Sequence, residues 1–115
     1  MRILLLRHGE AVSHANSDPE RRLSDHGRKT VVQTAGLLAG EAIDCILASP
    51  YLRARETAGI ICEMLGYAGK TEIASWLTPD TPKEEACRML NRSQGNCMLL
   101  VGHQPLLGSL AGLLA

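Results

Sequence analysis

The chain has 115 residues, enough for one domain with a real hydrophobic core, and its formal net charge at pH 7 is zero. This balance gives no electrostatic reason to expect binding to nucleic acid or to an anionic membrane. With no Phe and 3% aromatic residues, the chain also lacks the stacking platforms that bind single strands. The apolar run near the N-terminus is too short for a signal sequence or a membrane span, so we expect a cytoplasmic protein.

The four cysteines do not suggest a metal centre or a cofactor. None forms a C-x-x-C pair, and no histidine lies at ligand spacing from one of them. Cys45, Cys62 and Cys97 lie in apolar segments, which is typical of small buried side chains in a reducing compartment.

The first predicted element is a strand that ends at Leu6, directly before Arg7, His8 and Gly9. A short apolar run that ends at a turn signal is typical of a strand buried on both faces. Arg offers a planar set of donors for phosphate oxygens, and His offers a nucleophilic nitrogen near neutral pH. Gly9 would let the backbone approach a ligand closely. On its own, this tripeptide recurs by chance, and most Arg-His pairs at a strand end are surface residues.

A polar loop over residues 9–23 follows, and its length favours a functional role. Arg21 and Arg22 in this loop could contact phosphate or could belong to a solvated charge cluster. We expect Ser24 or Asp25 to cap a helix that runs to about residue 40, with an apolar face that includes Val31 and Val32. A short buried strand is predicted over residues 44–48.

The second strand also ends in a turn followed by an arginine. Residues 49 and 50 form the turn, and a helix is predicted from there to about Leu65. Arg53 would lie near the N-terminus of this helix, where the helix dipole disfavours a cation, so an anion beside it would explain its presence. Without an anion, Arg53 would be an ordinary surface arginine, which is the interpretation we give Arg55.

The last third of the chain repeats the pattern of strand and helix. A weak strand is predicted over residues 70–74, and a helix from a cap at Thr81 to about residue 91. A strong buried strand over residues 97–101 ends in Gly102 and His103, before a helix over residues 106–114. Taken alone, His103 could be a satisfied turn histidine.

This alternation predicts a three-layer α/β/α fold with a mostly parallel central sheet. Ligands bind at the carboxyl ends of strands in such sheets. Three strands would then deliver Arg7 with His8, Arg53 and His103 to one edge. The sequence therefore predicts a local electropositive pocket in a protein with no net charge.

At this point the chain resembles the histidine phosphatase superfamily, which includes phosphoglycerate mutase, and within it the short bacterial phosphohistidine phosphatases. The resemblance covers nearly all of residues 1–115, which we interpret as one histidine phosphatase domain. It also implies one or more further C-terminal strands of the family domain, which we expect to be missing from these residues. It depends on five segments in order, which are residues 6–11, 21–27, 48–54, 77–79 and 101–105.

The resemblance also implies roles for individual residues. His8 would attack phosphorus and become transiently phosphorylated, while Arg7, Arg53 and His103 would bind the phosphoryl group. Arg21 is a less certain phosphate contact, and Gly9 would bring backbone close to the substrate. We further expect a backbone carbonyl to hold the second ring nitrogen of His8, and we expect neither a metal nor another cofactor.

Two departures from the mutase-like branches narrow the expected activity. Ala11 and His14 replace a small polar residue and an asparagine, which argues against a sugar-phosphate mutase. No carboxylate clearly matches their general acid, with Asp80 and Glu84 as weak candidates. An imidazole can leave already protonated, so a phosphohistidine in a signalling or phosphotransfer protein is the expected substrate. A phosphatase for small phosphomonoesters and a non-catalytic phosphate-binding module are the alternatives.

Overall fold

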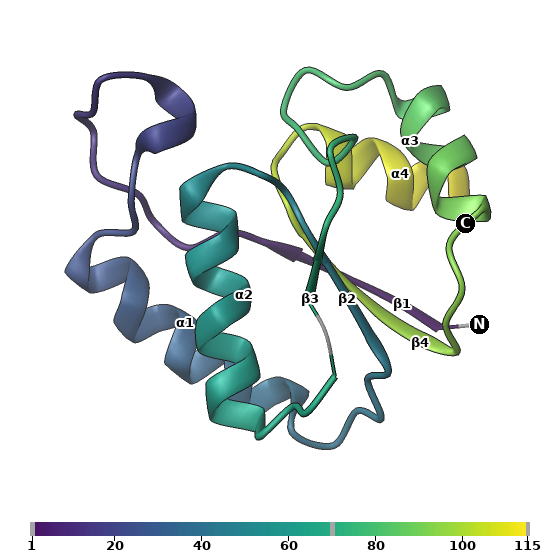
Figure 1. Ribbon diagram of the computed structural model, residues 1–115, viewed down its shortest axis with the longest axis horizontal. Helices are drawn as coiled ribbons and strands as arrows, with labels where there is room; N and C mark the ends of the chain where they lie inside the picture. Colours follow the sequence, from purple (N-terminus) through teal and green to yellow (C-terminus); the bar gives the residue numbers. More distant parts are fainter. Residues whose placement is uncertain (1, 70, 115) are drawn as a thin grey trace.

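The computed structural model describes residues 2–69 and 71–114. Its centre is a parallel four-stranded sheet with the order β1-β4-β2-β3. The predicted parallel sheet is therefore confirmed, and β1 and β4 are neighbours although they are far apart in the sequence (Figure 1). The strands are β1 (Arg2–Arg7), β2 (Cys45–Ala48), β3 (Thr71–Ile73) and β4 (Cys97–Gly102).

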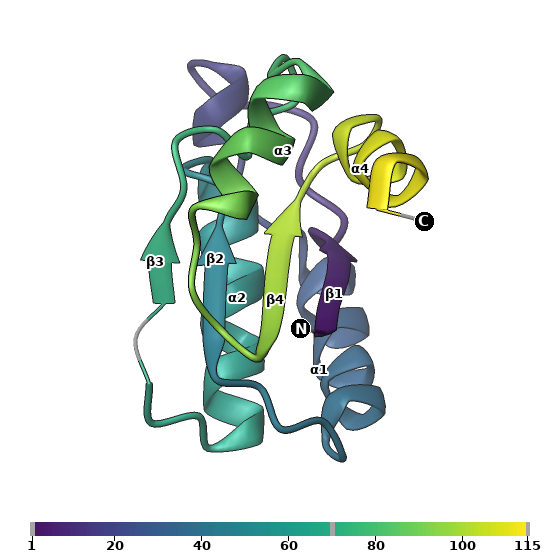
Figure 2. The same ribbon diagram turned by 90° about the vertical axis from the view of Figure 1, so that its right-hand side faces the viewer.

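Helices cover both faces of this sheet, as the predicted three layers require. In Figure 2, α3 and α4 lie in front of the strands, and α1 and α2 lie behind them. Lys70, part of the predicted third strand, lies outside the described residues. The helices are α1 (Asp25–Leu38), α2 (Leu52–Leu65), α3 (Lys83–Asn91) and α4 (Leu106–Leu114), and the short 3-10 helix η1 (Asp18–Glu20) lies in the polar loop.

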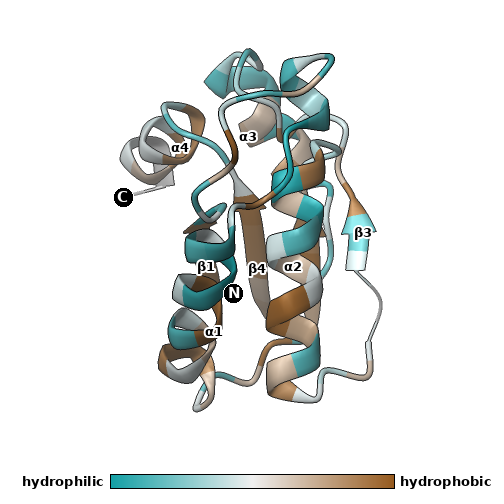
Figure 3. Cartoon of the chain, turned by 90° about the vertical axis from the view of Figure 1, so that its left-hand side faces the viewer, coloured by the Kyte–Doolittle hydropathy of each residue, from teal (hydrophilic) through white to brown (hydrophobic). Residues whose placement is uncertain are grey.

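Successive residues of each strand supply the two halves of the core in turn. Met98 and Leu100 of β4 pack beneath α3 and α4, whereas Leu99 and Val101 pack beneath α1 and α2. All four are fully buried. This alternation is the pleat of a strand that is covered on both faces. Figure 3 shows β4 in hydrophobic colour along its length behind α1 and α2.

Three predictions about burial are wrong. The apolar residues of β1 are only half-buried, because β1 lies at the edge of the sheet and pairs only with β4 among the described strands. Val32 was expected on the buried face of α1 but is 40% exposed, while Val31 one position earlier is 4% exposed. Cys45 and Cys62 are likewise half-buried, and of the three cysteines expected to be buried only Cys97 is.

The starts of two helices test the capping predictions. The Ser24 hydroxyl accepts a hydrogen bond from the Gly27 backbone N–H, so the predicted cap of α1 is confirmed. The predicted cap of α3 at Thr81 is wrong. Pro82 precedes that helix, and the Thr81 hydroxyl is instead hydrogen-bonded to the Thr78 hydroxyl at 2.7 Å.

Gly27 allows the first turn of α1 to pack directly on the chain that follows His8. A Cβ atom at Gly27 would lie 2.1 Å from the Glu10 carbonyl oxygen, which cannot move as a flexible side chain could. We expect Gly27→Ala to lower the free energy of unfolding by about 2 kcal/mol or more, measured by urea denaturation. Gly36→Ala is the matched control in the same helix, because nothing lies within 4 Å of its Cβ.

The control variant should be neutral or more stable by about 0.5–1 kcal/mol, since it removes a glycine from a helix interior. Equal effects of the two substitutions would contradict the close contact at Gly27.

No helix in the described part of the chain is long and apolar enough to cross a membrane.

Candidate active site

The carboxyl ends of β1, β2 and β4 bring the predicted site residues to one edge of the sheet. The ladder continues past the named strands, since the His8 N–H donates to the Gly102 carbonyl at 3.0 Å. The Ser49 N–H likewise donates to the Val101 carbonyl at 2.9 Å. These backbone bonds fix where the chain leaves the sheet at each site segment. Because all three strands run in the same direction, side chains distant in sequence meet here.

His8 is held at both ring nitrogens. Its Nδ1 lies 2.6 Å from the Gly9 carbonyl oxygen, which can only accept a hydrogen bond, so Nδ1 carries the proton. The Nε of Arg53 donates to His8 Nε2 at 3.2 Å, so Nε2 presents its lone pair. The expected backbone carbonyl partner of His8 is therefore confirmed. The ring is the neutral tautomer with a nucleophilic nitrogen at Nε2.

Gly9 locks the chain after His8 onto α2. Its N–H donates to the Thr57 hydroxyl at 3.0 Å, and that hydroxyl donates to the Arg53 carbonyl at 2.8 Å. A Cβ at Gly9 would lie 2.8 Å from Val31 Cγ2 and 3.0 Å from the Gly27 carbonyl oxygen. Only glycine allows this close approach, so the turn that carries the Nδ1 acceptor depends on Gly9.

Arg53 lies in the first turn of α2 and is only 5% exposed. While its Nε faces His8, its two terminal nitrogens face Asp18. Nη1 donates to the Asp18 carbonyl oxygen at 2.8 Å, and Nη2 donates to the Asp18 carboxylate at 3.2 Å. A buried guanidinium with partners along two edges has a fixed orientation.

Arg21 directly follows η1, and its side chain extends toward the site. Its Nη1 forms an ion pair of 2.8 Å with the Asp18 carboxylate, and its Nε donates to the Val12 carbonyl at 2.7 Å. Arg22, the second arginine expected there as a possible phosphate contact, instead donates to the Leu23 carbonyl at 3.3 Å. Of these two arginines, Arg21 lines the pocket beside His8.

His103 is buried at 2% exposure, with its ring centroid 4.9 Å from that of His8. Its Nε2 is hydrogen-bonded to the Ser49 hydroxyl at 2.7 Å. Its Nδ1 has no hydrogen-bond partner among the described residues, although a buried polar nitrogen without a partner is costly. The Tyr51 ring lies edge-on to the His103 ring, with the two ring centroids 4.9 Å apart.

Both imidazoles are kept neutral by their surroundings. Burial lowers the pKa of His8, and the hydrogen bond to Gly9 raises it by less. The positive charges of Arg53, Arg7 and Arg21 lower it further. Burial, followed by His8 and Arg53, lowers the pKa of His103 to about 4. At neutral pH, His8 is therefore available as a nucleophile and His103 as an uncharged hydrogen-bonding group.

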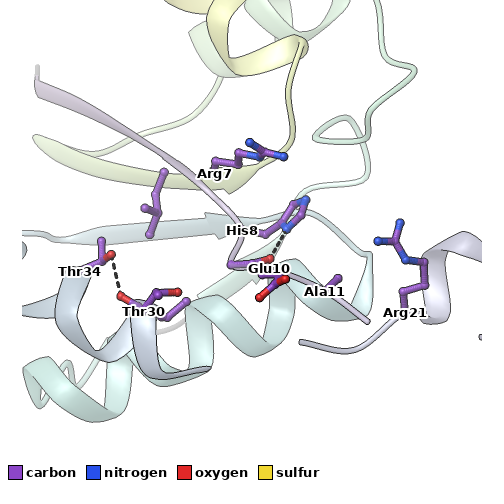
Figure 4. A pocket seen from close by; sticks show the side chains of 10 residues that line it. Arg7, His8, Glu10, Ala11, Arg21, Thr30 and Thr34 are labelled. Atoms are coloured by element: carbon purple, nitrogen blue, oxygen red, sulfur yellow. Dashed lines mark hydrogen bonds between the residues drawn. The ribbon is translucent and has the colours of Figure 1, made fainter. Parts of the chain in front are cut away.

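A pocket of about 450 Å³ opens beside His8 and is shown in Figure 4. Arg7 and Arg21 line it from two different segments, together with Glu10. The Arg7 side chain is exposed and makes no hydrogen bond or ion pair within the residues that the structure describes. Arg7 can therefore bind a substrate oxygen without first losing a partner.

Comparisons with known proteins agree with this arrangement. Residues 3–76 match the histidine phosphatase superfamily (branch 1). The chain belongs to the histidine phosphatase superfamily. It is 34% identical to the phosphohistidine phosphatase SixA homologue of Haemophilus influenzae, over 96% of this chain and 74% of the relative. Phosphohistidine phosphatase SixA of Escherichia coli is 30% identical, over 96% and 71%.

A solved structure of the protein histidine phosphatase SixA complexed with tungstate has the same fold. It superposes with a TM-score of 0.87 at 29% identity, and the match covers 97% of this chain and 75% of that one. The predicted family and fold class are therefore confirmed.

Some parts of this histidine phosphatase site were not predicted from the sequence. Asp18, Ser49 and Thr57 each contact a predicted site residue, yet only Ser49 belonged to a motif that had been singled out. Arg53 and His103 do not line the pocket of Figure 4 but lie against the His8 ring itself. Conversely, the weak candidates for a general acid, Asp80 and Glu84, are exposed, do not line that pocket and make no contact with His8 among the described residues. In the part of the chain that the structure describes, no group of three or more His, Cys, Asp or Glu could hold a metal ion.

The lowered pKa of His103 links the stability of the protein to pH. Between an unfolded pKa of 6.5 and a folded pKa of about 4, the unfolded chain binds the proton more readily. The neutral His103 therefore contributes its full stabilisation of the folded state above pH 6.5, and the folded state loses stability relative to the unfolded chain as the pH falls toward 4. From pH 7 to pH 5, we expect His103 to contribute about 2 kcal/mol to the decrease in the free energy of unfolding.

Urea denaturation of the wild type and of His103→Gln at both pH values measures this contribution. The variant should lose less stability than the wild type over the interval, because it has no imidazole at this position. An identical loss in both proteins would show that His103 takes up its proton equally well in the folded state.

Proposed function

We propose that the protein is a phosphatase that hydrolyses phosphohistidine through transient phosphorylation of His8. The observation that carries this proposal is the fixed neutral tautomer of His8. Its proton is bound at Nδ1 by the Gly9 carbonyl, and its lone pair at Nε2 faces Arg53. A nucleophile prepared in this way can attack phosphorus without a separate base. The SixA relatives, named phosphohistidine phosphatases, support the substrate class.

In the first step, the Arg53 Nε–H leaves His8 Nε2 for a phosphoryl oxygen, and Nε2 forms a bond to phosphorus while the bond from phosphorus to the substrate imidazole breaks. The departing imidazole leaves with a proton that it already carries or takes from water. Its conjugate acid has a pKa near 6.5, so it needs a protein acid far less than an alkoxide would. We therefore expect the reaction not to need a carboxylate in the position of Asp80 or Glu84.

In the second step, water attacks the phosphorus of phosphorylated His8. The bond from phosphorus to Nε2 breaks, inorganic phosphate is released and the neutral imidazole of His8 is regenerated. In phosphoryl transfer the attacking and leaving atoms lie in line through phosphorus, and the negative charge spread over the three equatorial oxygens must be stabilised. We assign this task to Arg7, Arg53 and His103, with Arg21 at the side of the pocket, so that guanidinium charge does the work without a metal.

The buried His103 supports this assignment in a second way. Its Nδ1 lacks a partner among the described residues, and a phosphoryl group beside His8 would bring one within reach of the ring 4.9 Å away. A neutral His103 can donate one hydrogen bond without adding charge. We also propose that the enzyme works in the cytoplasm, which suits its four free cysteines.

The test is phosphate release from a histidine-phosphorylated protein domain in excess chelator, with a small phosphomonoester in parallel. We expect release from the protein substrate and poor release from the ester. An identically purified His8→Ala protein corrects for contaminating phosphatases. Preference for the ester would favour the alternative small-molecule phosphatase. If the folded protein hydrolyses neither substrate, the site is a phosphate-binding module and the proposed activity is wrong.

A further inference from the structure

The Asp18 carboxylate is the shared partner of two arginines at the site. One of its oxygens, Oδ1, accepts from Arg21 Nη1 at 2.8 Å, and the other, Oδ2, accepts from Arg53 Nη2 at 3.2 Å. The Asp18 backbone oxygen adds a third contact, to Arg53 Nη1 at 2.8 Å. One residue of η1 therefore holds cationic side chains that come from two separate segments of the chain.

The edge of the Arg53 guanidinium that Asp18 contacts determines which edge faces His8. Asp18 takes both terminal nitrogens, on the side of the guanidinium away from Nε. The Nε side is thereby turned toward His8 Nε2, the nitrogen that we propose attacks phosphorus. A planar guanidinium held along one edge has its other edge fixed in direction as well. Asp18 thus holds the Nε edge in place against the reacting nitrogen of His8.

The turn that carries Asp18 is itself constrained. Pro19 follows it within η1, the Arg21 N–H donates to the Asp18 carbonyl at 3.2 Å, and the Ser17 hydroxyl donates to Glu20 at 3.1 Å. The hydrogen bonds of Arg21 reinforce the pair and lower the pKa of the Asp18 carboxyl, with Arg53 acting in the same direction. The carboxylate is therefore charged at neutral pH in a fixed place.

We propose that Asp18 is a positioning residue for oxyanion binding, which orients Arg53 and Arg21 around the phosphoryl group. This rests on the proposed function only in taking the anion to be a phosphoryl group. Two effects of Asp18 oppose each other. As a negative charge it repels an anion in the site, whereas as a clamp it prepares two donors for that anion. The proposal is that the second effect is larger.

Binding of tungstate, measured by calorimetry, separates the two effects because it requires no turnover. Asp18→Asn removes the charge and the ability to hold both arginines, and we expect the Kd for tungstate to rise about tenfold. If Asp18 only repelled the anion, the same substitution would tighten binding. Glu20→Gln is the matched control, since it removes a carboxylate from the same turn that contacts Ser17 and neither arginine. Its Kd should stay within about twofold of the wild type.

Two further readouts exclude a purely structural role. Asp18→Glu retains a carboxylate and should restore most of the affinity, and Asp18→Asn should shift the ¹⁵N resonance of His8 Nε2 because Arg53 loses its orientation. Because the Asp18 side chain is 52% exposed, we expect the variants to fold with melting temperatures close to that of the wild type.

An unchanged or lower Kd in Asp18→Asn would overturn the positioning role while leaving the proposed function intact. Weaker binding in Asp18→Asn, in a wild type that binds tungstate but does not hydrolyse phosphohistidine, would support the positioning role and contradict the proposed function. Absence of tungstate binding in the wild type would contradict both.

Discussion

Replacing His8 by alanine is expected to lower the rate of phosphohistidine hydrolysis by about 10⁴-fold or more. The substitution removes the only atom proposed to form a bond to phosphorus, and the remaining groups can only bind the substrate. The expected intermediate gives a second, independent measurement. Rapid quenching of the wild type with ³²P-labelled substrate should trap one acid-labile phosphate per chain, located at His8 by peptide mapping.

The binding groups provide the control for this loss. Because Arg7, Arg53 and His103 are unchanged in His8→Ala, we expect tungstate to bind the variant with a Kd within about tenfold of the wild type. A His8→Ala protein that still turns over at more than a hundredth of the wild-type rate would contradict the covalent mechanism. Label recovered on a residue other than His8 would contradict it as well.

Arg53→Lys is expected to lower kcat/KM for phosphohistidine about 10³-fold, although the positive charge is retained. Arg53 contacts His8 Nε2 and Asp18 at the same time, through three different nitrogens. A single ammonium group cannot reproduce this fork, so both the orientation of His8 and the stabilisation of the oxyanion should suffer. Steady-state kinetics with a phosphohistidine protein measures the effect.

Arg55→Gln is the matched control for Arg53→Lys in the same turn of α2. Arg55 is exposed and donates to the Pro50 carbonyl at 3.0 Å, as expected of a surface arginine. Its removal should change kcat/KM by less than about threefold and stability by less than about 1 kcal/mol. Comparable losses in the two variants would indicate a general effect of charge around the site rather than a directed contact of Arg53.

The sequence could predict the features of the site that depend on the direction of the strands. Once the apolar segments are taken as parallel strands, the residues after them must meet at one edge, so Arg7, His8 and His103 could be placed together. Arg53 was predictable from the helix start, where a cation is unexpected unless an anion is near. The neutral tautomer of His8 also followed from the chemistry of a nucleophile.

Tertiary packing decided the features that the sequence did not predict. The edge position of β1 depends on the order of strands, which no local pattern encodes, so the burial of its leucines was overestimated. Val31 and Val32 are equal in helical propensity, and only the direction of the sheet surface distinguishes them. Asp18 is one of several polar residues in a loop without periodicity, and its role comes from an arginine that lies far away in the sequence.

The pairing of β1 with β4 also limits when the site can form during synthesis of the protein. Among the strands that the structure describes, residues 2–7 are synthesised first and their partners at residues 97–102 are synthesised last. Until then, a run of leucines has no neighbour in the sheet, and closing so long a loop is slow. His8 directly follows β1, so the site can form only after β4 has paired with β1. Until that pairing forms, the backbone of the first strand is open to pairing with another chain.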